Sequence, residues 1–266
     1  MALIEILGYV GALVVGLVLG LIGGGGSILT VPIMVYLIGL NPIVATAYSL
    51  FVVGTTSVFG AFQNYKKGLV DVKTAIVFAV PAFIVVYLTR RYFVPIIPDV
   101  IFSIDDFEVT NNIFIMIFFA LVMLLASYSM IKGRKTIVPK EEQNLVYNYP
   151  LIAFQATVIG VFSGIVGAGG GFLIIPTLVL LGKLPMKKAI GTSLFVIAVN
   201  SLFGFLGDLS NIDINWTFLL TFTFISIIGI LIGSHFSKFI SGRRLKKGFG
   251  YFTIIMAIYI VYRELF

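Results

Sequence analysis

The chain has 266 residues, of which 59% are hydrophobic and only 11% charged, and its mean hydropathy is +1.12. Soluble domains carry about 25% charged residues, so composition excludes a water-soluble fold and lipid must cover much of the surface. The net charge of +7 comes from Lys and Arg residues that cluster between apolar segments, a pattern typical of cytoplasmic loops rather than of nucleic-acid binding.

The apolar segments are long and continuous, which predicts transmembrane helices rather than the alternating strands of a barrel. The first segment, Ala2–Ile22, carries Glu5 instead of a basic start, and we interpret it as a retained helix, not a signal peptide. In chain order we expect helices at 5–22, 28–37, 43–62, 74–97, 111–132, 149–166, 172–181, 189–206, 216–239 and 247–262. The predicted fold is an all-α, polytopic transmembrane helix bundle.

The sequence repeats itself after about 144 residues, and residues 20–72 align without a gap with residues 164–216. The stretch ending at Pro32 reads Gly-Leu-Ile-Gly-Gly-Gly-Gly-Ser-Ile-Leu-Thr-Val-Pro, and the one ending at Pro176 reads Gly-Ile-Val-Gly-Ala-Gly-Gly-Gly-Phe-Leu-Ile-Ile-Pro. Apolar helices seldom match by chance at Gly, Pro and Ser together, so the repeat indicates a duplication. We expect a first transmembrane repeat at 1–132, a cytoplasmic linker at 133–148 and a second transmembrane repeat at 149–266.

Equivalent loops of the two repeats carry opposite charge. Lys66, Lys67 and Lys73 follow the second element of the first repeat, whereas Asp208 and Asp213 follow its counterpart. Because basic loops favour the cytoplasm, the repeats are predicted to have inverted topology, with both chain termini outside a plasma membrane. Each Gly-broken first element then forms either a re-entrant, half-length hairpin or a tight crossing pair. The pair at 90–91, two Arg near the outer end of a helix, fits this orientation poorly.

Each repeat opens with a glycine-rich break, which cannot form a lipid-exposed helix because unpaired backbone amides in lipid are costly. The two breaks are therefore expected to face each other inside the bundle, each followed by a helix N-terminus. Free N–H groups and the helix dipole favour anions there, and glycine allows close approach. The alternative is that these glycines only permit tight helix packing. The candidate residues are Gly23, Gly24, Gly25, Gly26 and Ser27 in the first break, and Gly167, Gly169, Gly170 and Gly171 in the second.

Ser27 is expected either to add a hydroxyl to this site or to cap its helix. Pro32 and Pro176, about six residues into each new helix, are expected to kink or end a short arm rather than touch a ligand.

Polar residues within the second helix of each repeat are the other site candidates: Ser49, Thr55, Thr56, Ser57, Thr192, Ser193, Asn200 and Ser201. Ser and Thr can bond back to their own helix, whereas an amide cannot satisfy itself that way, so Asn200 is the strongest candidate. His235 is interpreted as an interfacial residue. The sequence holds no Cys and shows no nucleophile–base or metal-ligand motif in a membrane segment, so we expect no catalytic residues, metal or cofactor.

The two glycine motifs, with Ala45, Ser49 and Leu50 and with Ala189, Ser193 and Leu194, resemble the doubled signature of the TauE/SafE family, the sulfite exporter type. The resemblance covers nearly the whole chain and implies a permease for sulfite, sulfonates or related sulfur-containing anions, without metal. A passive anion channel and a non-transporting scaffold subunit remain open. The expected partners are a small anion and the lipid bilayer, with a homodimer as a further candidate and no nucleic acid.

Overall fold

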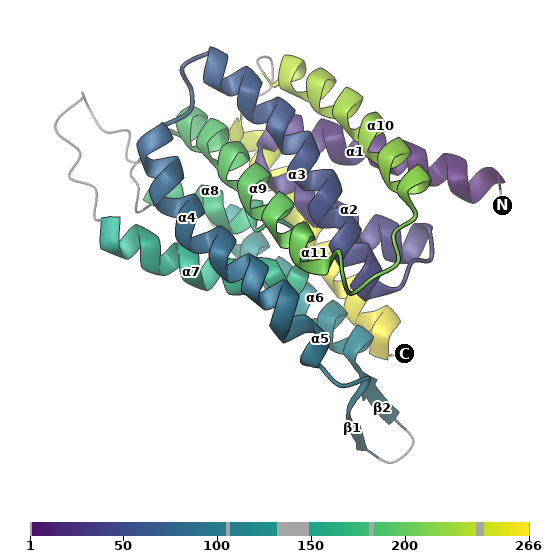
Figure 1. The fold of residues 1–266 in the computed structure, drawn as a ribbon. Helices are drawn as coiled ribbons and strands as arrows, with labels where there is room; N and C mark the ends of the chain where they lie inside the picture. The colour runs from purple at the N-terminus through teal and green to yellow at the C-terminus, as the bar shows by residue number, and fades with distance from the viewer. Residues whose placement is uncertain (1, 105–106, 132–148, 181–183, 238–241, 266) are drawn as a thin grey trace.

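The computed structural model describes residues 2–104, 107–131, 149–180, 184–237 and 242–265 as an all-α bundle with one small hairpin (Figure 1). In chain order its elements are α1 (Ala2–Ile22), the 3-10 turn η1 (Gly24–Gly26), α2 (Ser27–Pro32), the π-helical turn η2 (Ile33–Leu37), α3 (Pro42–Lys66), α4 (Val72–Leu88), the π-helical turn η3 (Thr89–Phe93), α5 (Val94–Ile96), β1 (Val100–Ile104), β2 (Phe107–Thr110), α6 (Asn111–Ile131), α7 (Tyr149–Val166), α8 (Gly171–Leu180), α9 (Met186–Asp208), α10 (Trp216–Phe236) and α11 (Gly242–Leu265). All ten predicted helices are present. The predicted linker at 133–148 lies outside the described residues.

Five helices in the described ranges are long and apolar enough to cross a membrane: α3, the unit α4–η3–α5, α6, α9 and α10. In α3 and α9, 67% of the most apolar stretch is buried inside the protein, against 39% to 44% in the other three. Helices α3 and α9 are therefore the central pair. The remaining spans present half or more of their apolar surface outward, as lipid-facing helices do.

The helices pack across the two repeats rather than within them. Helix α1 packs along α10 and α4 along α7, while α3 packs on α9 and α6 on α11. Adding 144 to the residue numbers of α1, α3 and α4 leads to their equivalents in the second repeat, α7, α9 and α10. Exchanging the repeats therefore turns the first contact into the second and leaves the α3–α9 contact unchanged, while α6 and α11, the last described helix of each repeat, also pack on each other. This is the contact pattern of two repeats related by a pseudo-two-fold axis.

Two matching hydrogen bonds hold the repeats in this register. The hydroxyl of Tyr48 accepts from the Asn215 backbone N–H at 2.6 Å, and the hydroxyl of Thr192 accepts from the Asp71 N–H at 2.9 Å. Tyr48 and Thr192 are 144 residues apart, as are Asp71 and Asn215. The side chains of Asp71 and Asn215 in turn accept from the third residue of the helix that each precedes, so the connection and the N-cap are fixed together.

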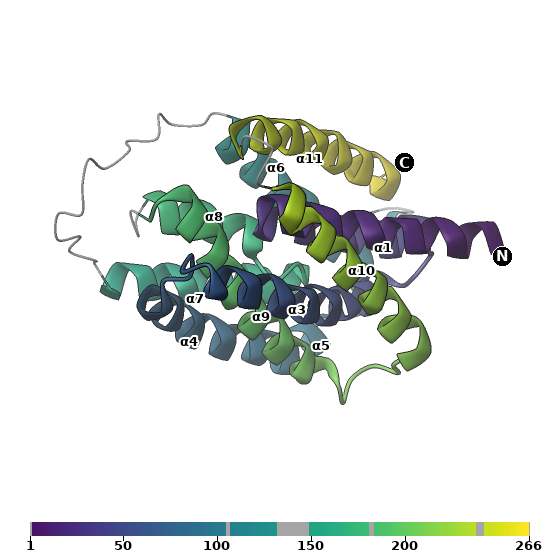
Figure 2. The ribbon, with the colours of Figure 1, turned by 90° about the horizontal axis from the view of Figure 1, so that it is seen from above.

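The connections between equivalent helices lie at opposite ends of the bundle. In both views the α3–α4 connection is at one end, while the α9–α10 connection and the two chain termini lie toward the other (Figures 1 and 2). The side of the membrane that each end faces stays a prediction.

Two features differ from the sequence-based expectation. The acidic segment after α5 forms an antiparallel hairpin, β1–β2, where only a loop was predicted. Asp208 was placed in an outer loop, which is wrong: it is the last residue of α9 and only 3% exposed. Helix α9 thus runs two residues further than its predicted apolar run.

Candidate functional site

The two glycine breaks leave the helical conformation in different ways. In the first, Gly23 has φ +77° and η1 follows before α2 starts at Ser27. In the second, Gly167, Gly169 and Gly170 have φ between +64° and +70°, and α8 starts at Gly171. Left-handed conformations of this kind are open to glycine at little cost, which explains why the chain uses glycine here. New helices therefore start after both breaks, as the sequence predicts.

The two breaks touch each other inside the bundle. A β-carbon on Gly24 would collide with the backbone of Gly171, and one on Gly171 would lie 2.5 Å from the α-carbon of Gly24. The central helices flank this contact, because Ile197 of α9 packs on both Gly169 and Gly171 and Val53 of α3 packs on Gly169. The prediction that the breaks face each other is thus matched by direct backbone contact. No anion fits between Gly24 and Gly171 in this conformation.

Two polar side chains lie against the second break, and other polar groups without a partner in the described chain are buried elsewhere in the helices. The Ser201 hydroxyl lies against Gly169, and a β-carbon on Gly170 would be 3.2 Å from the Ser163 hydroxyl. Both hydroxyls are buried and have no hydrogen-bond partner in the described chain. Further buried polar atoms without a partner there belong to Ser49, Thr56 and Ser57 of α3, to both amide atoms of Asn200 of α9, and to Thr30 of α2. Thr30 and Ser163 were not predicted from the sequence as site residues.

Other predicted site residues have local structural contacts. Ser27 donates to the Gly24 carbonyl at 2.8 Å, so its hydroxyl holds the first break together. Ser193 donates to the Ile190 carbonyl and comes near Gly23. Thr192 anchors the α3–α4 connection through the Asp71 N–H, and Thr55 is half-buried on α3. Pro32 ends α2 where the π-helical turn η2 begins, whereas Pro176 lies inside α8.

A buried ion pair lies beside the second break, where the sequence analysis proposed no site. Nη1 of Arg90 is 3.3 Å from Oδ2 of Asp208 and donates to the Thr46 hydroxyl at 3.1 Å. Arg90 is fully buried, and its Nε and Nη2 have no hydrogen-bond partner among the described residues. A β-carbon on Gly167 would lie 2.5 Å from Nη2, so the guanidinium is in contact with the break. Elements η3, α3 and α9 thus bring one cation to the glycines of the second repeat.

Sequence alone carried one signal for this pair. Arg90 lies within a long apolar run, and charged residues in such segments usually face the protein interior and mark a functional site. The partner was out of reach of sequence reasoning, since Asp208 is far along the chain and was assigned to a loop.

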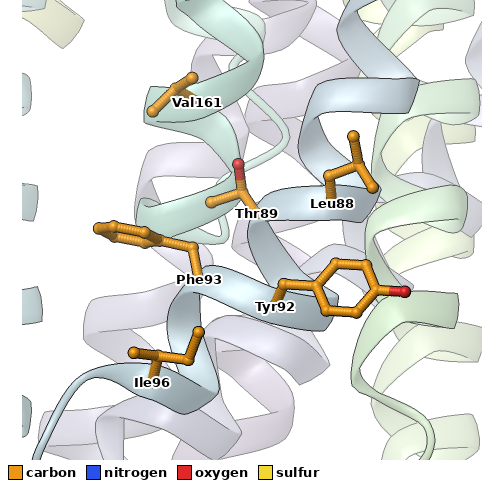
Figure 3. A pocket seen from close by; sticks show the side chains of 6 residues that line it. All are labelled: Leu88, Thr89, Tyr92, Phe93, Ile96 and Val161. Carbon is orange, nitrogen blue, oxygen red and sulfur yellow. The ribbon is translucent and has the colours of Figure 1, made fainter.

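Two surface hollows lie elsewhere. An apolar groove of about 390 Å³ is lined by Leu88, Thr89, Tyr92, Phe93, Ile96 and Val161, with the Tyr92 and Phe93 rings pointing to opposite sides (Figure 3). All of these side chains except Thr89 are exposed and apolar or aromatic, so the groove suits lipid rather than an anion. A smaller cleft of about 230 Å³ is lined by Gln63, Lys67, Leu231, Ser234 and His235. This cleft brings a cation and polar groups to the C-terminal ends of α3 and α10.

The sequence is similar to known membrane proteins over almost its whole length. Residues 9–260 match the family described as Sulfite exporter TauE/SafE. A probable membrane transporter protein of Xylella fastidiosa is 30% identical over 256 residues, covering 94% of this chain and 92% of the relative. The probable membrane transporter protein YunE of Bacillus subtilis is 27% identical over 270 residues, covering 94% and 91%.

A third relative matches only part of the chain. The probable membrane transporter protein MJ0441 of Methanocaldococcus jannaschii is 36% identical over 132 residues, covering 46% of this chain and 48% of that protein. No solved structure matches the chain. The family match and the five candidate spans together make this chain a multi-pass membrane protein that belongs to the sulfite exporter TauE/SafE family, a family of membrane transporters.

Proposed function

We propose that the chain carries a small anion across the membrane by alternating access, with sulfite, a sulfonate or a related sulfur-containing anion as substrate. The observation that supports this most is the contact between the two glycine breaks at Gly24 and Gly171. Broken helices that meet in the interior are typical of substrate sites in transporters with repeated halves. The N–H groups of Leu173 and Ile174 in the first turn of α8 donate to the Gly170 carbonyl, and the positive end of the α8 dipole favours an anion at this point.

The buried polar side chains of the bundle are suited to an anion without being strongly charged. The hydroxyls of Ser57, Ser163 and Ser201 and the amide of Asn200 are buried and unpaired within the described chain. Each can donate a hydrogen bond to an oxyanion. Burying unpaired polar groups costs free energy, so a ligand that pairs them would recover part of that cost. Sulfur oxyanions present several acceptor oxygens, which is why we favour them over chloride.

The contact at Gly24 and Gly171 favours a carrier over a passive channel. The touching backbones close the direct path between the two breaks, so an anion can bind there only after the repeats move apart. Alternating access supplies such a movement, opening the site to one side at a time. A plasma-membrane location with both termini outside, and a homodimer as the assembled form, belong to the same proposal.

Flux into proteoliposomes tests the proposal. Purified protein is reconstituted, and the uptake of sulfite, thiosulfate, sulfate, a sulfonate and chloride is compared with protein-free vesicles, with and without a pH gradient. We expect saturable uptake of at least one sulfur-containing anion, with chloride carried poorly. Absence of uptake of every anion by folded, correctly inserted protein would contradict the proposal and favour the scaffold alternative. Saturable uptake that is equal for all five would contradict the substrate class.

A further inference from the structure

The buried guanidinium of Arg90 is only partly satisfied in the described structure. It donates one hydrogen bond, to Thr46, and makes one charge contact, to Asp208 at 3.3 Å. Its Nε and Nη2 have no acceptor among the described residues, although the whole side chain is inaccessible to solvent. A guanidinium carries five N–H donors in a planar fork that matches oxyanions. Leaving donors of a buried cation unpaired is costly, and the described residues provide no acceptor for these two nitrogens, so a bound anion could supply one.

The position of Arg90 shows where that acceptor would come from. Nη2 lies against Gly167, the first residue of the second break, and the β-carbon of Arg90 lies against Gly207. Because Gly167 has no side chain, the guanidinium faces the bare backbone just before α8 begins. The N-terminus of α8 and the unpaired N–H groups of Arg90 therefore flank the same glycine turn, and both favour negative charge.

The other repeat carries no counterpart of this cation. The offset of 144 residues takes Arg90 to Ser234 and Thr46 to Ile190. Ser234 donates to Gln63 Oε1 and lies in the cleft with Lys67, at the opposite end of α3 from Thr46. Seventeen residues separate Thr46 from Gln63, which is roughly 25 Å along a helix. The charged pair and the polar cleft thus occupy the two ends of the central helices, with the breaks between them.

We propose that Arg90 is the cationic group that receives the anion at the second break, and that Asp208 holds its guanidinium when no anion is bound. The inference rests on the proposed transport of an anion and adds the residue that recognises its charge. Without the anion, Asp208 keeps a buried cation from standing unpaired, a state that is strongly destabilising. When an oxyanion arrives, it takes the unpaired Nε and Nη2 donors and competes with Asp208 for the guanidinium. Breaking and re-forming the Arg90–Asp208 ion pair then accompanies the opening and closing of this end of the site.

Paired substitutions separate recognition from folding. The double variant R90Q/D208N removes both buried charges and leaves neither unpaired, so we expect it to fold and melt near wild type. We expect the sulfite concentration for half-maximal uptake in proteoliposomes to rise about tenfold or more, the loss of roughly one charge-assisted interaction. Arg91→Gln is the matched control, because Arg91 lies in the same turn but is half-buried, and it should leave uptake unchanged.

The single variant Asp208→Asn tests the competition directly. It leaves the buried Arg90 cation unpaired, so without sulfite the variant should melt below wild type. Added sulfite should raise its melting temperature by more than it does for wild type, and sulfite should half-saturate uptake at a several-fold lower concentration. If the double variant does not fold, an unchanged or raised half-saturation in Asp208→Asn overturns the inference. A folded double variant that takes up sulfite like wild type also overturns it while leaving the proposed function intact. Absence of uptake of every anion by wild type overturns both.

Discussion

At the residue scale, the buried polar side chains of this bundle differ in whether their hydrogen-bonding groups find a partner. Thr157, Thr177, Thr221 and Thr223 each donate to the carbonyl four residues earlier, the usual way in which a membrane helix satisfies Thr. The buried polar side chains of α3 and α9 at 56–57 and 200–201 make no such bond in the described chain, and they occupy matching positions of the repeat. A bundle used only for packing gains nothing from keeping them unpaired, so they argue for a ligand.

Ser201→Ala should separate stability from transport. The substitution removes a buried hydroxyl that has no partner in the described chain, and the desolvation cost of such a group is about 1–3 kcal/mol. We expect the variant to melt at or above the wild-type temperature while sulfite uptake falls several-fold. Ser127→Ala is the control, since Ser127 is equally buried on α6 but donates to the Leu124 carbonyl, and it should leave uptake unchanged. Full uptake by Ser201→Ala would remove this residue from the site.

Part of the proposed site could be predicted from the sequence. The glycine runs stood out because consecutive glycines interrupt a membrane helix, and Asn200 because an amide cannot satisfy itself by bonding back to its own helix. Arg90 was noted only because it fits the predicted orientation poorly, and Asp208 was assigned to a loop, so neither was predicted as a site residue. Their pairing depends on η3 and the end of α9 meeting in space, which no local pattern records.

At the scale of elements, α1 and α10 approach more closely than side chains would permit. A β-carbon on Gly16 would collide with the Ser226 carbonyl, and one on Gly20 would lie 2.5 Å from the Ile230 carbonyl. Gly229 and Gly233 of α10 face α1 in the same way, and Ser226 donates to the Ala12 carbonyl across the interface. Small residues four apart allow this approach in membranes, where lipid gives no hydrophobic drive for association. Glycine therefore also serves packing here, as the alternative interpretation of the motifs allowed, at positions outside the breaks.

Two glycine-to-alanine substitutions should change the stability of the protein in opposite directions. Gly20→Ala places a methyl group against the α10 backbone, and overpacking of this kind costs about 1–3 kcal/mol. Gly248→Ala places the same methyl in open space on α11 and should stabilise that helix by up to about 1 kcal/mol. We expect thermal unfolding in detergent to show a lower melting temperature for Gly20→Ala and an unchanged or higher one for Gly248→Ala. Equal melting temperatures would mean that α1 and α10 are not held this closely.

The helices themselves could be predicted well, and their partners could not. The lengths of the apolar runs predicted the ends of α3, α4 and α10 to within a few residues, since this signal is local. The hairpin β1–β2 was missed because its strands are short and lie in an acidic segment. That α1 packs on α10 of the other repeat depends on matching glycine surfaces more than 200 residues apart, which becomes visible only in the folded chain.

At the scale of the whole molecule, the direction of the repeats decides how the site can alternate. Two repeats with opposite orientation can exchange conformations and so open the same central site first to one side and then to the other. The connections after α3 and after α9 lie at opposite ends of the bundle, as this arrangement requires (Figures 1 and 2). The basic connection should face the cytoplasm and the acidic one the outside.

Single cysteines test this orientation on a chain that naturally contains none. Lys67 and Asp213 are both exposed and lie in equivalent connections of the two repeats. In intact cells a membrane-impermeant maleimide should label Asp213→Cys at once, whereas Lys67→Cys should react only after the membrane is permeabilised. The cysteine-free parent gives the background of the assay. Labelling of both variants from outside would place the two equivalent connections on the same side of the membrane. Inverted repeats forbid that arrangement. The proposed alternating access of a central site would then have no structural basis.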